Sequence, residues 1–214
     1  MSDPTPPAPQ KRSGRQRSSE KGEAILEAAS SLFLQRGLQG TSMDQVAKDA
    51  GVSKQTVYSH FENKEGLFRA CIRGKVASYG FEDHAVADGD SVQEILLQAV
   101  RRFMSLIFDP EVVSMYRVVL SEAVAHPRIA SLFYENGPEA TVAAVAEVLR
   151  GLVARGLLRE HDNTAAARQL LNLSFGDFHI RLLLNLIEQV PQAELDEHLR
   201  MVVEDFVALY GMRP

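Results

Sequence analysis

The sequence predicts an all-α protein in two parts, a small N-terminal helical domain followed by a larger C-terminal helical domain. Apolar residues recur at three- and four-residue steps from residue 18 onward, and no segment shows the alternating pattern of a half-buried strand. Glycine and proline interrupt these stretches where helices would end or begin. The charge is divided as well, since the first third of the chain is basic and the remainder is acidic.

Composition places the chain among ordinary globular proteins. With 214 residues, of which 45% are hydrophobic and 24% charged, it is typical of a soluble protein. No apolar run approaches the roughly 18–20 residues of a membrane span, and the N-terminus lacks the apolar core of a signal peptide. Cys71 is the single cysteine, which excludes an internal disulfide and a cysteine cluster for zinc; we expect it to pack inertly rather than to sense redox state. We therefore expect a cytoplasmic protein that carries no cofactor.

The net charge of −5 conceals an asymmetry along the chain. Residues 10–80 carry twelve lysines and arginines against seven acidic residues, a net charge of +5, whereas residues 81–214 carry eleven against twenty, a net charge of −9. Screening limits electrostatic attraction to a Debye length of about 8–10 Å, so the charge of a segment matters more than the total. The first third is therefore suited to a polyanion such as DNA, although uneven charge also arises by chance.

Residues 1–17 predict a disordered basic arm, because they combine prolines with basic residues and almost no apolar side chain. From Ser18 the pattern becomes helical, with Ser18 or Ser19 as the N-cap. Gly37 followed by Leu38 predicts a left-handed C-terminal cap with its apolar contact. The residues that define the arm are Pro4, Pro6, Pro7, Pro9, Lys11, Arg12, Arg15 and Arg17.

Beyond residue 62 the chain continues as a series of helical patterns separated by glycine or proline. We expect a helix over 63–83 to connect an N-terminal domain of residues 18–65 to a C-terminal domain of residues 66–214. The remaining helical patterns lie at 91–108, 111–125, 127–135, 138–155, 164–188 and 193–210.

Residues 41–61 predict two short helices joined by a tight turn. Thr41 and Asp44 form an S/T-x-x-D start signal for the first helix, and Gly51 supplies the positive φ that the turn needs. Ser53 then caps a second helix of about eight residues. A helix that short is not stable alone, so its neighbours must hold it in place.

The apolar residues of this segment form an inner stripe and leave the polar ones outside. Ala47 is small where the two helices cross. Two short helices joined by a glycine turn are typical of the DNA-binding helix-turn-helix, whose second helix enters a major groove about 12 Å wide. An ordinary corner between two helices with a polar outer face is the alternative. The inner stripe consists of Met43, Val46, Ala47, Ala50, Val52, Val57 and Phe61.

The solvent side of the second helix carries hydrogen-bonding groups suited to base edges and phosphates. Lysine matches guanine O6 and N7, glutamine matches adenine, and threonine offers a hydroxyl or a methyl group. Lys64, at the start of the following helix, adds a cation and a helix N-terminus that can face phosphate. The residues on this side are Lys54, Gln55, Thr56, Tyr58, Ser59 and His60.

Residues 18–68, and above all the run GVSKQTVYSHFENKEGLF, resemble the TetR/AcrR family of transcriptional regulators. The resemblance rests on a first helix that ends in a glycine turn, on the helix-turn-helix, and on a tail formed by Tyr58, His60, Phe61, Lys64 and Leu67. It implies base reading by Lys54, Gln55 and Thr56, and contacts to the DNA backbone by Thr41, Ser42, Tyr58, His60 and Lys64. Together with the cap residue Ser53, these form the predicted DNA-binding set. The run YRVVLSEAVAHPRIASLFYENGPE resembles the ligand domain of the AefR-like branch.

In regulators of this family the remaining helices form a ligand-binding and dimerisation domain, and two segments favour these roles. The helix predicted over 138–155 is rich in small residues, which permits close approach of two helices. The helix predicted over 164–188 is apolar nearly all round, which indicates burial on both faces, one of them by a partner subunit. We therefore expect a homodimer in which these helices form a four-helix interface. A wholly internal central helix is the alternative.

Apolar and aromatic residues of the intervening helices are the candidates for a small-molecule pocket, because ligand sites are mostly apolar with a few convergent polar groups. His179 either meets a ligand or metal or is a hydrogen-bonded core histidine. Asn172, Asp177 and Arg181 are further polar residues in the apolar helix. The predicted pocket set is Met104, Phe108, Met115, Tyr116, Phe133, Phe175 and His179, with Phe103 and Tyr134 as additional candidates.

These features favour a ligand-responsive transcriptional repressor that binds a pseudo-palindromic operator as a dimer and is released by a small molecule. A repressor or activator of the same fold that answers to no ligand is the alternative. A protein that coats DNA without specificity would be basic as a whole, whereas this chain is acidic. An enzyme is disfavoured, because the sequence has no phosphate-binding glycine loop, nucleophile elbow or paired-histidine metal motif. One helix also cannot bring Ser174, Asp177 and His179 together.

Overall fold

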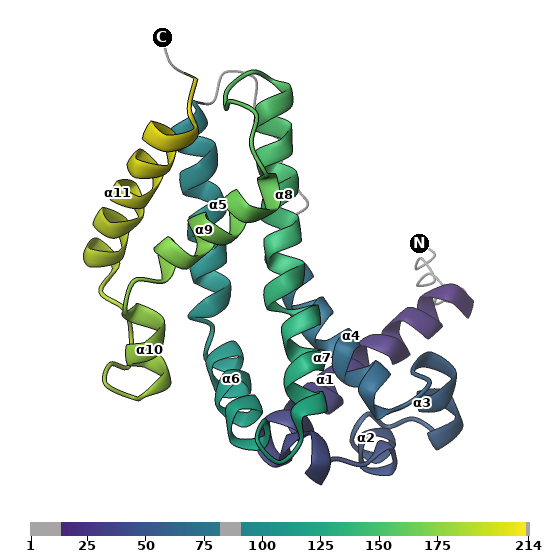
Figure 1. Cartoon of the computed structure of the whole chain (residues 1–214). Helices are drawn as coiled ribbons and strands as arrows, with labels where there is room; N and C mark the ends of the chain where they lie inside the picture. The colour runs from purple at the N-terminus through teal and green to yellow at the C-terminus, as the bar shows by residue number, and fades with distance from the viewer. Residues whose placement is uncertain (1–13, 82–90, 213–214) are drawn as a thin grey trace, which may run out of the picture.

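The computed structural model describes residues 14–81 and 91–212, and within these ranges the chain is built of helices (Figure 1). The predicted all-α class is confirmed, since no strand forms in the described ranges and Leu158 and Gly211 make only an isolated antiparallel bridge. Residues 1–13 of the predicted disordered arm lie outside the described residues. The helices are α1 (Gly14–Gly40), α2 (Met43–Asp49), α3 (Lys54–His60), α4 (Lys64–Ala77), α5 (Val92–Ile107), α6 (Pro110–Glu122), α7 (Pro127–Asn136), α8 (Pro138–Ala154), α9 (Asn163–Phe175), α10 (Phe178–Leu183) and α11 (Gln192–Tyr210).

Two hydrophobic cores hold these helices together. The first lies among α1–α4 and contains Phe33 and Phe68, whose rings meet edge to face with centroids 5.2 Å apart. The second lies among α5, α8, α9 and α11, around residues such as Leu149 and Phe206. The two halves of the sequence are nevertheless interlocked, because α6 and α7 complete the first core with Met115, Val119, Ile129, Leu132 and Phe133.

α1 begins at Gly14, ahead of the predicted start at Ser18, and it is bent near its end. Gly37 has φ 68° and ψ 177°. The positive φ matches the prediction for this glycine, but the extended ψ differs from a left-handed cap. The chain therefore kinks at Gly37 and makes a further short turn to Gly40, with Leu38 buried beside the kink.

The prediction of a single helix over 164–188 is wrong. α9 ends at Phe175 because Gly176 adopts φ 49° and ψ −136°, and the separate short helix α10 follows. Asn185, with φ 56°, turns the chain again after α10. An apolar pattern continues through such breaks, because it records which residues are apolar and not where the backbone turns. Four residues of this region remain exposed in the single chain: Leu173, Ile180, Leu184 and Leu186.

The arrangement of the helices places α6 at the junction between the helix-turn-helix and the rest of the molecule (Figure 1). α6 packs against α1 and α7, and it also contacts α5 and α10. Its start is fixed by Asp109, which accepts hydrogen bonds from the backbone N–H groups of Glu111 at 2.9 Å and Val112 at 3.3 Å, ahead of Pro110 as the first helical residue. No helix in the described ranges combines the length and apolar character needed to cross a membrane.

Candidate DNA interface and ligand cavity

The helix-turn-helix forms as predicted, except for the residue that caps its first helix. Ser42 rather than Thr41 is the N-cap of α2, since its hydroxyl accepts a hydrogen bond from the backbone N–H of Gln45 at 3.2 Å. Thr41 is buried, and its hydroxyl donates to the carbonyl of Gly37 at 2.8 Å. Thr41 and Ser42 are adjacent hydroxyl residues, and the sequence allowed either of them to cap α2. Thr41 does not cap the helix, because its hydroxyl bonds to Gly37 at the kink of α1.

The turn and the second helix are stabilised by short-range contacts. Gly51 has φ 65°, and open space surrounds the position where a Cβ would lie, so the backbone conformation alone calls for glycine. Ser53 accepts from the backbone N–H of Thr56 at 3.1 Å, and the two hydroxyl oxygens lie 2.8 Å apart. Val57 is fully buried. These contacts confirm Ser53 as the cap and leave the polar face of α3 outward.

The outward face of α3 carries a lysine that is already oriented by neighbouring groups. The Lys54 ammonium lies 2.7 Å from the Asp44 carboxylate, and it also lies 6.0 Å from the centre of the Tyr58 ring. The hydrogen bond and charge of Asp44 raise the pKa of Lys54 above its ordinary value. Gln55 is exposed beside it, and Tyr58 is 45% exposed. A charged lysine, an amide and a phenol thus share one accessible surface.

Lys64 has an internal role that the sequence did not indicate. Its ammonium donates to the carbonyl of Thr41 at 3.0 Å and approaches that of Gln39 at 3.5 Å, so it ties the start of α4 to the loop between α1 and α2. His60, at the other end of the surface, lies beside Gly22 of α1, where an added Cβ would be 3.6 Å from its Nδ1 atom. Lys48, exposed in the last turn of α2, is a further cation on this domain that the sequence reasoning left out.

A cavity of about 650 Å³ opens between the two cores. Its walls come from α1 and from α4 through α9, so it touches both the helix-turn-helix domain and the C-terminal helices. Its volume lies within the range of about 300–1,000 Å³ that is usual for ligand pockets. Six of the predicted candidates line it: Phe103, Met115, Tyr116, Phe133, Tyr134 and Phe175.

Three predicted pocket residues do not line the cavity. Met104 is fully buried in the second core, on a different side of α5 from Phe103. Phe108 packs edge to face on Phe178, with ring centroids 6.4 Å apart. His179 lies behind the wall, with its ring 4.8 Å from that of Tyr116 and 5.2 Å from that of Phe175.

His179 is therefore neither a cavity residue nor a histidine with both nitrogens satisfied. Its buried Nε2 atom has no hydrogen-bond partner among the described residues, and burial lowers its pKa to about 4. The ring is thus neutral at neutral pH and acts as an aromatic support for Tyr116 and Phe175. The sequence did not indicate much of the wall, because its members come from helices far apart in the chain; they include Leu34, Ile72, Lys75, Leu106, Ile107, Val112, Val119, Leu120, Ala130 and Arg168.

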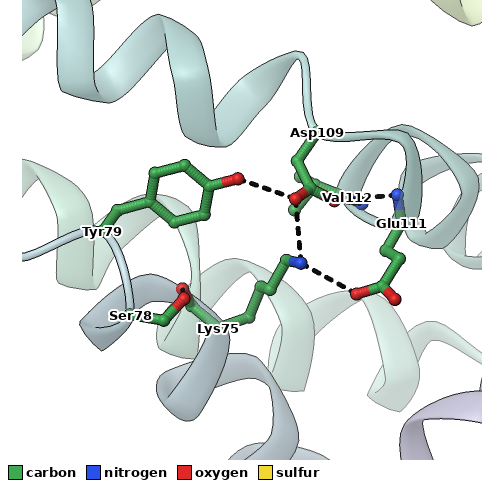
Figure 2. A network of polar contacts seen from close by, with 6 residues as sticks. All are labelled: Lys75, Ser78, Tyr79, Asp109, Glu111 and Val112. Atoms are coloured by element: carbon green, nitrogen blue, oxygen red, sulfur yellow. Dashed lines mark hydrogen bonds and ion pairs between the residues drawn. The ribbon is translucent and has the colours of Figure 1, made fainter.

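The charged groups at the cavity wall are held in two ion-pair networks. In the first, the Lys75 ammonium lies 2.9 Å from Asp109 and 2.8 Å from Glu111, and the Tyr79 hydroxyl donates to Asp109 at 2.7 Å (Figure 2). In the second, Arg168 pairs with Glu139 at 3.0 Å. The first network ties the end of α4 to the start of α6.

Burial and hydrogen bonding compete in setting the pKa values of the first network. Burial opposes the charged forms of Lys75 and Asp109, but their mutual contact and their hydrogen bonds raise the pKa of Lys75 and lower that of Asp109. Burial and the hydrogen bond to Asp109 raise the pKa of Tyr79 to about 12. All three groups therefore hold their ordinary ionisation states over a wide pH range around neutrality.

The end of α6 rests directly on the kink of α1. The Glu122 carboxylate occupies the space beside Gly37, where an added Cβ would be 1.8 Å from Oε1. The other carboxylate oxygen, Oε2, is buried without a hydrogen-bond partner among the described residues. Val119 and Leu120, which precede Glu122 on the same helix, line the cavity. A single turn of α6 thus contacts both the cavity and the helix that supports α2 and α3.

A helix-turn-helix with an accessible polar second helix, joined to a helical domain that encloses an apolar cavity, is typical of a DNA-binding transcriptional regulator. Residues 25–71 match the bacterial regulatory proteins of the tetR family, and residues 94–212 match the C-terminal domain of AefR-like transcriptional repressors. The chain belongs to the TetR family, which confirms the resemblance seen in its sequence.

Individual relatives agree with this assignment. The solved structure of a TetR-family regulator from Mesorhizobium loti is 30% identical with a TM-score of 0.75, over 92% of this chain and 99% of that one. The flavonoid-responsive regulator FrrA is 31% identical with a TM-score of 0.73, over 92% of this chain and 100% of its own. The regulator AcrR of Shigella flexneri is 30% identical over 118 residues, 54% of this chain, and the match spans about half of AcrR, 53% of its length.

Proposed function

We propose that the chain is a homodimeric repressor that binds a pseudo-palindromic operator and leaves it when a small molecule enters the cavity. The observation that carries this proposal is the shared wall: α1, α4 and α6 line the cavity and also belong to the core that supports the helix-turn-helix. A ligand that needs a different spacing of these helices would therefore change the position of α3. We place the action of the protein in the cytoplasm, with its DNA.

DNA recognition is assigned to the outward face of α3. Lys54, Gln55 and Thr56 would read base edges, and Ser42, Ser53, Tyr58 and His60 would contact the DNA backbone. Before DNA binds, the contact with Asp44 holds the Lys54 side chain in position. On binding, Lys54 would exchange this contact for one with DNA. Thr41 and Lys64 are assigned a supporting role first, because their side chains already bond within the domain.

Dimerisation is assigned to an exposed apolar face on the C-terminal helices. The face, here called the α9–α11 face, consists of Leu173, Ile180, Leu184, Leu186, Met201 and Leu209. Exposed fractions of 51% at Ile180 and 61% at Leu184 are large for isoleucine and leucine. The six residues lie on α9, on α10 and the turn after it, and on α11, and α9 packs against α11. The larger apolar residues of α8 are mostly buried within the chain, among them Val142, Val145, Leu149 and Leu152, so we shift the proposed interface from residues 138–155 towards α11.

Release follows from a shift in population between two arrangements of the dimer. In one arrangement the spacing of the two recognition helices fits the operator, and in the other it does not. The ligand must bind the second arrangement more tightly, because a ligand with equal affinity for both would not change their populations. The name of FrrA records a response to a flavonoid in a protein of similar fold. A regulator that answers to no ligand is the alternative, and the size of the cavity disfavours it.

Selection of bound sequences from random DNA, followed by fluorescence anisotropy, tests the DNA-binding part. We expect an enriched palindrome whose half-sites lie one helical turn apart, about 34–36 Å. Binding to it should fall steeply with salt, and DNA with one scrambled half-site serves as the control. Recovery of no common sequence, or equal affinity for the scrambled site, would contradict the proposal.

A further inference from the structure

The walls of the cavity are aromatic where they come from α5, α6, α7 and α9. Phe103 meets Phe175 edge to face with ring centroids 5.1 Å apart, and Tyr116 meets Phe133 in the same way at 4.8 Å. Aliphatic side chains such as Val119 and Leu171 fill the surface between these pairs. Rings arranged in this way offer both faces and edges to a planar guest, which favours an aromatic ligand over a flexible chain.

The charges at the wall are already neutralised by protein groups. Within the described chain three charged side chains line the cavity, namely Lys75, Glu111 and Arg168. Lys75 is shared between two carboxylates, as Figure 2 shows, and Arg168 bonds to Glu139 and to the Tyr134 hydroxyl at 3.2 Å. A charged ligand would have to break one of these pairs or stay without a counter-ion in an apolar space, and both are costly.

Among the described residues, two polar side chains at the wall, on α6 and α9, have their full hydrogen-bonding capacity free for a ligand. The Tyr116 hydroxyl and the Asn172 amide have no hydrogen-bond partner in the part of the chain that the structure describes, and both residues line the cavity. Tyr116 is held between Phe133 and His179, whose rings both lie 4.8 Å from its own. Its hydroxyl is thus fixed in position before a ligand arrives, and burial raises its pKa to about 12, which keeps it protonated.

We infer that the cavity takes an uncharged, largely aromatic molecule of two or more rings that carries a hydrogen-bonding oxygen, with Tyr116 as the residue that recognises this oxygen. The inference rests on the proposed function for its consequence on DNA, but ligand binding can be measured without DNA. Charge decides the class of ligand, and the Tyr116 hydroxyl decides where its oxygen lies.

A series of probes on one biphenyl skeleton tests the charge preference by calorimetry on the full chain. The probes are 4-phenylphenol, 4-phenylbenzoate, the trimethylammonium analogue and 4-methylbiphenyl. The phenol is uncharged at pH 7, because phenols titrate near a pH of about 10. We expect the phenol to bind at least about tenfold more tightly than either charged analogue, because an uncharged molecule can enter the cavity without breaking an ion pair of its wall. Equal or tighter binding of a charged analogue, or no binding of any probe, would overturn the inference.

The role of Tyr116 is tested with Tyr116→Phe, which removes only the hydroxyl. Affinity for 4-phenylphenol should fall about threefold to tenfold, as for one hydrogen bond, while affinity for 4-methylbiphenyl should not change. Tyr210→Phe is the matched control, because the Tyr210 hydroxyl bonds to Gln169 and lies outside the cavity. Equal loss for both probes would mean that the ring has moved and would overturn the assigned contact.

Release of DNA is measured separately, so that the two proposals can fail independently. If the phenol binds with the expected order but leaves the DNA complex intact, the ligand class stands and the proposed release fails. If instead a charged analogue is the better binder and releases DNA, the proposed function stands and the inferred ligand class fails.

Discussion

At the scale of single residues, side chains on the candidate DNA surface are also parts of the structure that presents them. Lys54 is paired with Asp44 across α2 and α3, and Lys64 closes the loop between α1 and α2. Gln55 differs from both, because it is exposed and no contact within the described chain occupies its amide. Substitution of Gln55 therefore tests recognition with little change to the fold.

Gln55→Ala should weaken binding to the selected operator and relax the preference at one base pair per half-site. The expected loss is about 1–3 kcal/mol of discrimination at that position, because one bidentate contact disappears. The comparison is Lys48→Ala on α2, which should weaken all sequences alike and reduce the slope of log affinity against log salt by about 1. Anisotropy titrations over a set of operator variants measure both. A uniform effect of Gln55→Ala would remove it from the base-reading set.

Gly37 is one of the residues at which the two halves of the molecule touch. Gly37→Ala should lower the free energy of unfolding by about 1–3 kcal/mol from backbone strain alone, and further because the new Cβ displaces Glu122. Gly156→Ala is the matched control, since Gly156 has the same φ of 68° and open space around it. Urea unfolding measures both. Adding Glu122→Ala should recover part of the loss at Gly37, and equal losses in the two single variants would show that the carboxylate is not in the way.

At the scale of elements, α6 connects the functional regions. Its first turn is tied to α4 through Asp109, its middle lines the cavity at Tyr116 and Val119, and its end rests on α1 at Glu122. Arg117 on the same helix donates to the carbonyl of Leu183 at 3.1 Å, at the end of α10. α6 is thus in contact with the DNA-binding domain, the cavity and the edge of the α9–α11 face.

The network at the start of α6 predicts how stability depends on pH. The folded-state pKa of Asp109 is lowered, so its contribution is present above the unfolded value of about 3.9 and is lost as the pH falls through the folded one. The pKa values of Lys75 and Tyr79 are raised, so their contributions are present below their unfolded values, about 10 for both, and are lost as the pH rises through the folded ones, which for Tyr79 is about 12.

Asp109→Asn should therefore cost about 1–2 kcal/mol at neutral pH, because asparagine keeps the cap but loses the charge-assisted bonds to Lys75 and Tyr79. The difference from the wild-type chain should shrink below a pH of about 4. Asp162→Asn is the control, since Asp162 caps α9 in the same way but forms no ion pair in the described chain. Thermal unfolding across pH measures the effect; a difference that persists unchanged at low pH would rule out the charge as its cause.

At the scale of the whole molecule, one chain presents a single recognition helix, α3, at the end opposite α11 (Figure 1). A two-fold symmetric operator therefore needs a second copy, and the α9–α11 face is the surface that a copy would cover. The exposed apolar residues of this face would then be buried in the dimer. Leu173, Ile180, Leu184 and Leu186 lie in the segment 164–188 that we expected at the interface from the sequence, whereas α11 was not part of that expectation.

Ile180→Glu combined with Leu184→Glu should convert the dimer to a monomer, because two charges would be buried without partners. Operator affinity should fall more than about a hundredfold, since the second half-site no longer binds within the same molecule. Val124→Glu is the control, as Val124 is 96% exposed and lies off this face, between α6 and α7. Sedimentation and anisotropy measure the two effects. A variant that stays dimeric, or a wild-type chain that is monomeric when bound, would move the interface elsewhere.

The sequence by itself determined what depends on neighbours a few residues apart. The helix-turn-helix could be read because its caps, its glycine turn at Gly51 and its buried Val57 are local signals, each set by one turn of backbone. The all-α class followed from a periodicity that repeats along the chain. Where two local signals competed, as at Thr41 and Ser42, the sequence allowed both registers.

Only the tertiary structure decided which helices share a core and which side chains face a common space. Leu34 of α1 and Phe175 of α9 line the same cavity. They are so far apart in the chain that no periodic pattern in the sequence could show that they lie close together. Met104 and Phe103 are neighbours of similar character, and both are buried in the second core, but only the packing of α5 decided that Phe103 also lines the cavity and Met104 does not. The sequence around Gly37 predicts the end of a helix. It does not predict the contact of Gly37 with Glu122, which exists because α6 packs against α1. Interactions between residues close in the sequence therefore set where the helices form. The burial of apolar side chains from distant segments decides which helix faces pack together.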